Sequence, residues 1–158
     1  MNYYGKREAV LASTNGVAFE IYIAGCNKGE GYCGGCHSPH LWEKDQGKII
    51  DEEFYIDLVD YMLNKEWQFD NIVLLGGEPL DNSKEDVLEF VRQMKILNKK
   101  LWLYTHFELD EIDDDIKKAF DYIKTGKYIE EFKDDNYQSR DICLMTSNQK
   151  INQKGIDY

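Results

Sequence analysis

Phe19-Glu-Ile-Tyr-Ile-Ala-Gly-Cys26 joins an apolar segment directly to the first of three clustered cysteines. Residues 19–24 are rich in β-branched and aromatic side chains, which predicts a β-strand. The chain continues as Gly25-Cys-Asn-Lys-Gly-Glu-Gly-Tyr-Cys-Gly-Gly-Cys-His37, which holds three of the four cysteines. The sequence therefore predicts a strand that ends in a glycine-rich loop of thiols.

Short apolar runs and longer amphipathic runs alternate along the rest of the chain. This order is typical of βαβ units around a mostly parallel sheet. Ser83 and Asp86 match a helix capping box. The last thirty or so residues are polar and poorly periodic, so no element is predicted there. The predicted strands are residues 71–75, 101–105 and 122–125, and the predicted helices are residues 52–67, 83–97 and 110–120.

Three distinctive loops follow three of these strands. They are the cysteine loop after Ala24, the turn Gly76-Gly-Glu-Pro79 after Leu75, and the turn Thr105-His106. Parallel strands joined by right-handed crossovers deliver such loops to the same carboxyl edge of the sheet. We therefore expect an active site at that edge.

Length and charge limit the class of protein. The chain has 158 residues, 19 Lys+Arg and 30 Asp+Glu, so its net charge is −11. That length predicts a single domain over residues 1–158. The acidic balance argues against nucleic acid and anionic membrane surfaces, because like charges repel. No long apolar run or signal-peptide layout is present, so the expected compartment is the cytoplasm.

The clustered thiols have two chemical interpretations. In a reducing cytosol, such cysteines indicate metal or cluster ligation before a disulfide. A structural zinc would need a fourth ligand, which His37, His40 or Cys143 could supply. An iron–sulfur cubane held by Cys26, Cys33 and Cys36 would instead leave one iron open to a chelating substrate. The spacing alone leaves both interpretations open.

The turn Gly76-Gly77-Glu78-Pro79 favours the cluster. Alone, such a turn only terminates a strand. Its glycines also allow close approach, and its carbonyl groups can face an ammonium group. Next to a three-cysteine loop, this combination is much more specific.

The combined motifs resemble the radical S-adenosylmethionine superfamily, and within it the subfamily that activates anaerobic ribonucleoside-triphosphate reductases. The similarity runs from about residue 16 to residue 151. The closing Ser-Asn-Gln-Lys-Ile151 is the part most typical of that subfamily. The matching segments are Ala24-Gly-Cys26, Cys33-Gly-Gly-Cys-His-Ser-Pro-His-Leu-Trp42, Leu74-Leu-Gly-Gly-Glu-Pro-Leu80, Leu101-Trp-Leu-Tyr-Thr105 with Glu108-Leu109, Tyr122-Ile-Lys-Thr-Gly-Lys-Tyr-Ile-Glu-Glu131 and Ser147-Asn-Gln-Lys-Ile151.

The resemblance implies a reaction, its cofactors and its partners. A [4Fe–4S] cluster would reductively cleave S-adenosylmethionine to a 5′-deoxyadenosyl radical, which would generate a glycyl radical on the reductase. An electron donor such as flavodoxin is implied as well. The implied cluster ligands are Cys26, Cys33 and Cys36, and the implied S-adenosylmethionine contacts are Gly76, Gly77 and Glu78 to the amino group, Gly35, Cys36 and His37 along the nucleoside, and Thr105.

The segments that form the predicted site differ from the family pattern at two places. Six residues, 27–32, separate the first two cysteines where the family usually has three, and His106 follows Thr105 where a glycine is common. A relative that acts on another glycyl-radical protein or on a small molecule would share this core. A structural zinc-binding interaction module is the alternative from another class.

The expected architecture is an α/β fold of radical S-adenosylmethionine type. A closed eight-stranded barrel takes about 250 residues. The expected form is therefore a partial, open βα barrel of five to six mostly parallel strands, whose open side admits a protein substrate.

Overall fold

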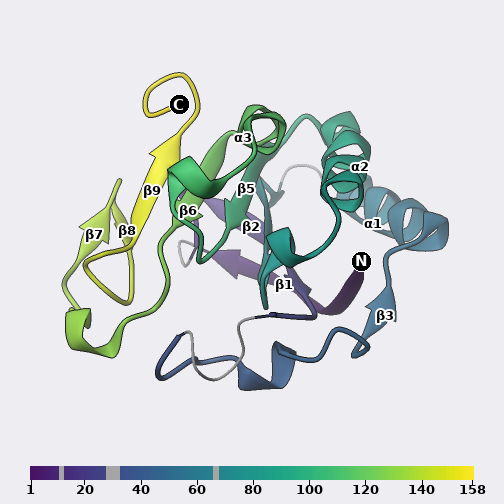
Figure 1. Cartoon of the computed structure of the whole chain (residues 1–158). Coiled ribbons are helices and arrows are strands. Elements are labelled where there is room, and N and C mark those ends of the chain that lie inside the picture. The colour runs from purple at the N-terminus through teal and green to yellow at the C-terminus, as the bar shows by residue number, and fades with distance from the viewer. Residues whose placement is uncertain (11–12, 28–32, 66–67) are drawn as a thin grey trace.

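The computed structural model describes residues 1–10, 13–27, 33–65 and 68–158. A mixed sheet of seven strands lies at the centre of the molecule (Figure 1). In spatial order its strands are β3 (Lys48–Ile49), β1 (Asn2–Val10), β2 (Val17–Ile23), β4 (Asn71–Gly76), β5 (Lys100–Tyr104), β6 (Tyr122–Thr125) and β9 (Lys150–Gln153).

The middle of the sheet is parallel. β2, β4, β5 and β6 run in the same direction, whereas β1, β3 and β9 pair antiparallel at the two sides. The four parallel strands coincide, within two residues at each end, with the four strands predicted from the sequence. Their carboxyl ends therefore lie along one edge, which is where the loops of interest begin.

In the residues that the structure describes, three α-helices connect the strands: α1 (Glu52–Asn64), α2 (Lys84–Met94) and α3 (Asp114–Ala119). The predicted cap of α2 is confirmed, because the Ser83 side chain accepts a hydrogen bond from the Asp86 N–H. The last turn predicted for α1 reaches Trp67, which lies outside the described residues. The helix predicted over residues 110–120 is too long. A 3₁₀ turn occupies Leu109–Glu111, and α3 begins only after Asp113, whose carboxylate accepts from the Asp115 N–H and caps it.

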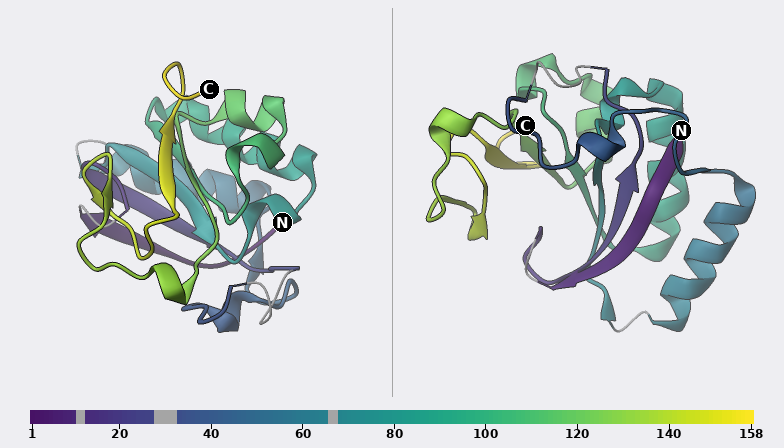
Figure 2. Two further views of the ribbon diagram at one scale, coloured as in Figure 1. Left: turned by 60° about the vertical axis from the view of Figure 1, so that its left-hand side comes forward. Right: turned by 90° about the horizontal axis from the view of Figure 1, so that it is seen from below.

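Side chains alternate between the two faces of the sheet and build two cores. On one face, Ile21, Leu74 and Leu103 pack with the apolar sides of α1, α2 and α3. On the other face, Val73 and Trp102 pack against the segment that carries β7 (Gln138–Ser139) and β8 (Ile142–Cys143). Figure 2 shows the helices and the β7–β8 ribbon on opposite sides of the sheet.

The flanking strands β1, β3 and β9 were not predicted. β1 has only one buried side chain, Ala9, and β9 is mostly polar. Among the described residues, no pairing joins β3 to β9, and the partial barrel stays a prediction. Within the same residues, no helix combines the length and apolar character needed to cross a membrane.

Candidate functional site

One cavity of about 250 Å³ lies where the three loops meet at the carboxyl edge of β2, β4 and β5. The structure thus brings together the segments that the sequence placed at one edge. Glu78 and Gly35 are the two predicted site residues that do not line it. The predicted site residues in its wall are Cys26, Cys33, Cys36 and His37 from the first loop, Gly76 and Gly77 from the second, and Thr105 from the third, next to His106.

Backbone hydrogen bonds join the glycine turn to the start of the cysteine loop. The Gly77 N–H donates to the Ile23 carbonyl at 2.8 Å, and the Glu78 N–H donates to the Gly25 carbonyl at 2.7 Å. A Cβ on Gly77 would lie 2.2 Å from the Gly25 carbonyl oxygen. This contact requires a glycine at position 77, because a side chain would separate the two loops.

The described ends of the cysteine loop are anchored from a second side. The Cys26 N–H donates to the Trp42 carbonyl at 3.0 Å, and the Asn27 N–H donates to the Asp81 carboxylate at 2.5 Å. Of the six-residue spacer that the sequence singled out, only Asn27 belongs to the described residues. Residues 28–32 lie outside them.

The three thiols differ in their surroundings. Burial raises the pKa of the Cys33 thiol, although the Tyr128 backbone and the Lys124 charge oppose this effect. The Cys36 sulfur accepts the Ser38 N–H at 3.4 Å. In iron–sulfur proteins, hydrogen bonds of this kind to the sulfur atoms help to set the reduction potential of the cluster. Cys143, on β8, is exposed and does not line the cavity.

The segment after Cys33 packs against the loop that follows β6. Gly35 has φ +84°, and a Cβ there would lie 3.1 Å from the Tyr128 ring. The His37 ring centre lies 4.9 Å from that of Tyr128. The turn between Cys33 and Cys36 therefore needs a glycine at position 35. The atoms closest to this glycine belong to other residues of the chain.

Cys26, Cys33 and Cys36 all line the same cavity. A mononuclear zinc site needs ligands that converge on one point at about 2.0–2.3 Å. In the described part of the chain, no group of three His, Cys, Asp or Glu side chains is arranged to hold a metal ion. A [4Fe–4S] cluster instead carries its thiolates on separate irons.

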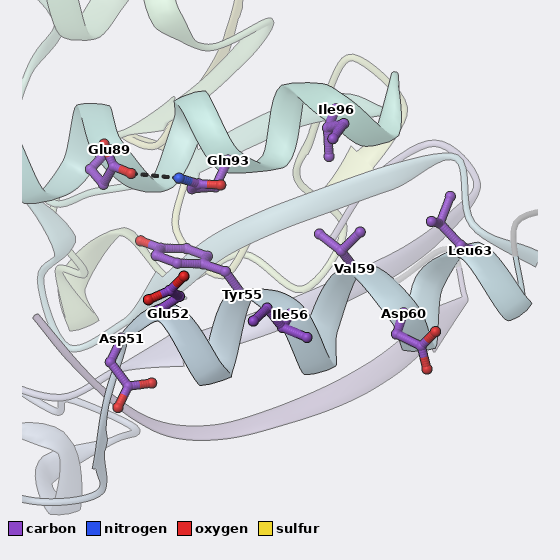
Figure 3. A pocket seen from close by; sticks show the side chains of 10 residues that line it. All are labelled: Asp51, Glu52, Tyr55, Ile56, Val59, Asp60, Leu63, Glu89, Gln93 and Ile96. Carbon is purple, nitrogen blue, oxygen red and sulfur yellow. Dashed lines mark hydrogen bonds between the residues drawn. The ribbon is translucent and has the colours of Figure 1, made fainter.

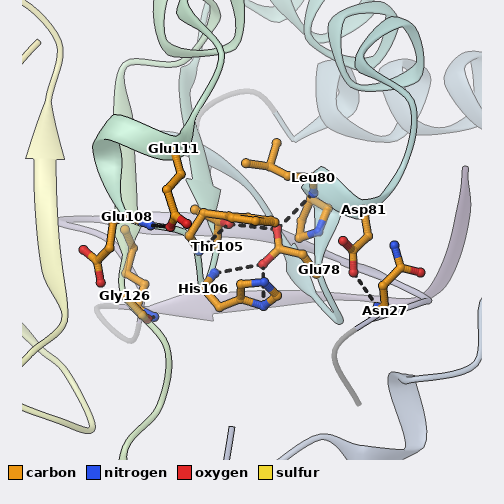
Figure 4. A network of polar contacts seen from close by, with 12 residues as sticks. Asn27, Glu78, Leu80, Asp81, Thr105, His106, Glu108, Glu111 and Gly126 are labelled. Atoms are coloured by element: carbon orange, nitrogen blue, oxygen red, sulfur yellow. Dashed lines mark hydrogen bonds and ion pairs between the residues drawn. The ribbon is translucent and has the colours of Figure 1, made fainter. Parts of the chain in front are cut away.

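Glu78 is buried, and Figure 4 shows that it joins the turn after β4 to the turn after β5. Its carboxylate accepts from the Thr105 hydroxyl at 2.8 Å, the His106 N–H at 2.8 Å and the Leu80 N–H at 3.0 Å. Burial raises the pKa of Glu78 to about 7. The Glu78 carboxylate is thus engaged by the chain itself, and its contact with an amino group stays a prediction.

Lys124 is a cavity residue that the sequence analysis missed. It lies on β6 opposite Tyr104 of β5, and its ammonium donates to the Gly126 carbonyl at 2.7 Å. It is 9% exposed and forms no salt bridge with any residue that the structure describes. Burial lowers its pKa to about 8. The sequence feature that could have indicated this position is a lysine inside the short predicted strand Tyr-Ile-Lys-Thr125.

Comparison with known proteins places the chain in a family. Residues 12–152 match the 4Fe–4S single cluster domain family. The chain belongs to this family of iron–sulfur proteins.

Two relatives share most of their length with it. Both are named anaerobic ribonucleoside-triphosphate reductase-activating protein. The protein from Haemophilus influenzae is 26% identical over 140 residues, which are 85% of this chain and 88% of the relative. The protein from Vibrio cholerae is 25% identical over 150 residues, which are 89% of this chain and 92% of the relative. The resemblance found in the sequence is therefore confirmed.

Proposed function

We propose that this chain is a radical S-adenosylmethionine enzyme that generates a glycyl radical on an anaerobic ribonucleoside-triphosphate reductase. The convergence of three thiols and the Gly76–Gly77 turn on one cavity, in a chain of a 4Fe–4S family, is the observation that carries the proposal. The names and coverage of the two relatives support the choice of protein substrate.

Each predicted site residue has a role in this proposal. Cys26, Cys33 and Cys36 hold the cluster and leave one iron open to S-adenosylmethionine. Gly76, Gly77 and Glu78 position its amino group, residues 35–37 lie along the nucleoside, and Thr105 adds a polar contact. When bound, the cluster supplies the electron that cleaves the sulfonium of S-adenosylmethionine into methionine and a 5′-deoxyadenosyl radical.

The charge of Lys124 supports an anionic occupant of the cavity. A buried ammonium is costly unless negative groups compensate its charge, and those that act on Lys124 are Glu78, Cys33 and Glu108. Lys124 lines the cavity together with all three cysteines. Thiolates bound to a cluster supply negative charge at that place, so the lysine fits the loaded site.

The remaining parts of the proposal follow from size and chemistry. We expect the sheet to be the partial, open barrel of this superfamily, which leaves the cavity accessible to a large protein substrate. We also expect a cytoplasmic location and an electron donor of the flavodoxin type, because the cluster needs a reducing environment.

Anaerobic reconstitution with iron and sulfide tests the proposal. The loaded chain should bind four irons and four sulfides and, once reduced with dithionite, cleave S-adenosylmethionine to 5′-deoxyadenosine. Cys36→Ser should abolish this cleavage, whereas the matched variant Cys143→Ser should retain it. A colourless chain with one zinc per molecule would refute the proposal and favour the structural zinc module.

A further inference from the structure

A groove of about 660 Å³ runs between α1 and the end of α2, away from the cysteine cavity (Figure 3). Its apolar lining consists of Tyr55, Ile56, Val59, Leu63 and Ile96. Within the described part of the chain, the groove and the cysteine cavity share no lining residue. Binding in the groove and chemistry in the cavity can therefore be tested separately.

The apolar side chains of the groove are unusually exposed. Ile96 is 74% exposed, Ile56 62% and Leu63 55%. On α1, Ile56, Val59 and Leu63 follow helical spacing i, i+3 and i+7, which places them on adjoining turns. A contiguous apolar surface with a polar rim marks an interaction site.

The polar part of the lining has one sign of charge. It includes the carboxylates of Asp51, Glu52, Asp60 and Glu89, and none of the described residues that line the groove is a Lys or Arg. Figure 3 shows Asp51, Glu52 and Glu89 toward one end.

The apolar side chains gather toward the other end. Val59, Leu63 and Ile96 lie there in Figure 3. Three of the four carboxylates thus lie toward one end, whereas Asp60 lies near Val59 and Leu63 at the apolar end. A complementary partner is therefore apolar, with its basic side chains concentrated at the end that faces Asp51, Glu52 and Glu89.

We propose that this groove binds an amphipathic helix of the protein substrate, with apolar side chains at helical spacing and Lys or Arg at one end. The inference rests on the proposed function, because the partner is the reductase. A space between two helices accepts a third helix, whose apolar stripe packs into it. A second copy of this chain is a poor occupant, since each copy carries a net charge of −11.

The contact also fits the reaction. An enzyme that acts on one glycine of a large protein must hold that protein in one orientation. A docking surface outside the cavity supplies orientation without occupying the reaction space. Opposite charges at the acidic end would also accelerate encounter with the reductase.

The test uses the cluster-loaded chain and the anaerobic ribonucleoside-triphosphate reductase from the same organism. The variant Leu63→Glu with Ile96→Glu places two charges in the apolar end. The matched control is Ile156→Glu, since Ile156 is 67% exposed and lies outside the groove. Two quantities are measured for each protein: its Kd for the reductase, and dithionite-driven cleavage of S-adenosylmethionine without the reductase.

The groove variant should bind the reductase about tenfold more weakly or worse, while cleavage without the reductase is unchanged. The control should match the wild type in both. Glu52→Gln with Glu89→Gln should reduce the salt dependence of binding, because fewer charges are then screened.

Several outcomes would overturn the inference. Unchanged reductase affinity in the groove variant would refute the docking site. A change in oligomeric state would assign the groove to a second copy, and slower reduction by flavodoxin alone would assign it to the electron donor. If the wild-type chain does not cleave S-adenosylmethionine, the proposed function is refuted instead. Failure of the docking inference and failure of the proposed function are therefore distinguishable.

Discussion

Glu78 and His106 form a buried pair that joins the ends of β4 and β5. The same Glu78 carboxylate oxygen accepts the His106 N–H at 2.8 Å and lies 3.0 Å from the ring Nδ1. Since Gly77 directly precedes Glu78, the pair also fixes the glycine turn against the cysteine loop. The wall of the cavity therefore depends on a carboxylate that does not line it.

This pair gives the stability of the chain a pH dependence. The pKa of Glu78 is raised to about 7, above its unfolded value near 4.5. Between these values the unfolded chain has lost the Glu78 proton and the folded chain has kept it. The free energy of unfolding therefore falls as pH rises through this window, by on the order of 3 kcal/mol. Urea unfolding between pH 4.5 and 8 under reducing conditions measures it.

The Glu78→Gln variant supplies the comparison. It lacks the titrating group, so its curve should be flatter than that of the wild type over the same window. The control variant Glu53→Gln, on the exposed side of α1, should show the same dependence of stability on pH as the wild type. Parallel curves for the wild type and Glu78→Gln would contradict the assignment.

Gly77→Ala should disturb the junction between the two loops. The new Cβ would meet backbone atoms of Gly25, which cannot move aside as a flexible side chain can. We expect a loss of about 1–3 kcal/mol in the free energy of unfolding, as for other overpacked sites. Gly34→Ala is the matched control, because a Cβ there meets nothing within 4 Å. It should stay within about 0.5 kcal/mol of the wild type, and equal losses in both variants would contradict the close-contact argument.

Substitution of the cluster cysteines should separate folding from cluster binding. Cys26→Ser, Cys33→Ser and Cys36→Ser should each leave a folded chain, because the sheet and its two cores do not include these residues. Each should lose visible absorbance and iron after reconstitution. Circular dichroism and metal analysis check this result. Unfolding of all three variants would instead indicate a structural metal that contributes to folding.

Lys124→Met should shift the reduction potential of the loaded cluster to a more negative value. A buried ammonium favours the reduced, more negative state, and methionine keeps the length of the side chain without the charge. Stability should be retained or increased, because the cost of burying the charge disappears. Lys133→Met, at an exposed position, should leave the potential unchanged. A spectroscopic redox titration measures the potential of the cluster in each variant. Equal potentials for Lys124→Met and the wild type would exclude an electrostatic effect of Lys124 on the cluster.

The parallel centre of the fold could be predicted because its strands are apolar and short. Ile72, Val73 and Leu74 lie in an uninterrupted buried run, and such a run needs little context to predict. β1 could not be predicted in the same way, since five of its nine residues, from Asn2 to Val10, are charged, amide or glycine residues. Its place in the sheet is set by antiparallel pairing with β2, the next strand along the chain.

In the candidate site, too, some residues could be predicted from local sequence and others could not. The cysteines and Gly76–Gly77 stand in recognisable local motifs, so the sequence could bring them to one edge. Lys124 could not be predicted as a cavity residue, because its position depends on the register between β5 and β6. The hydrogen bond from the His106 N–H to the Glu78 carboxylate could not be predicted either, since it joins two loops whose residues are 28 apart in sequence.

Electron paramagnetic resonance of the anaerobic reductase tests the central claim most directly. The reductase is incubated with the loaded chain, S-adenosylmethionine and a reductant, and the spectrum is recorded after the two proteins are separated. We predict a glycyl radical signal on the reductase that requires Cys36 and S-adenosylmethionine. Formation of 5′-deoxyadenosine without any protein radical would contradict the claim.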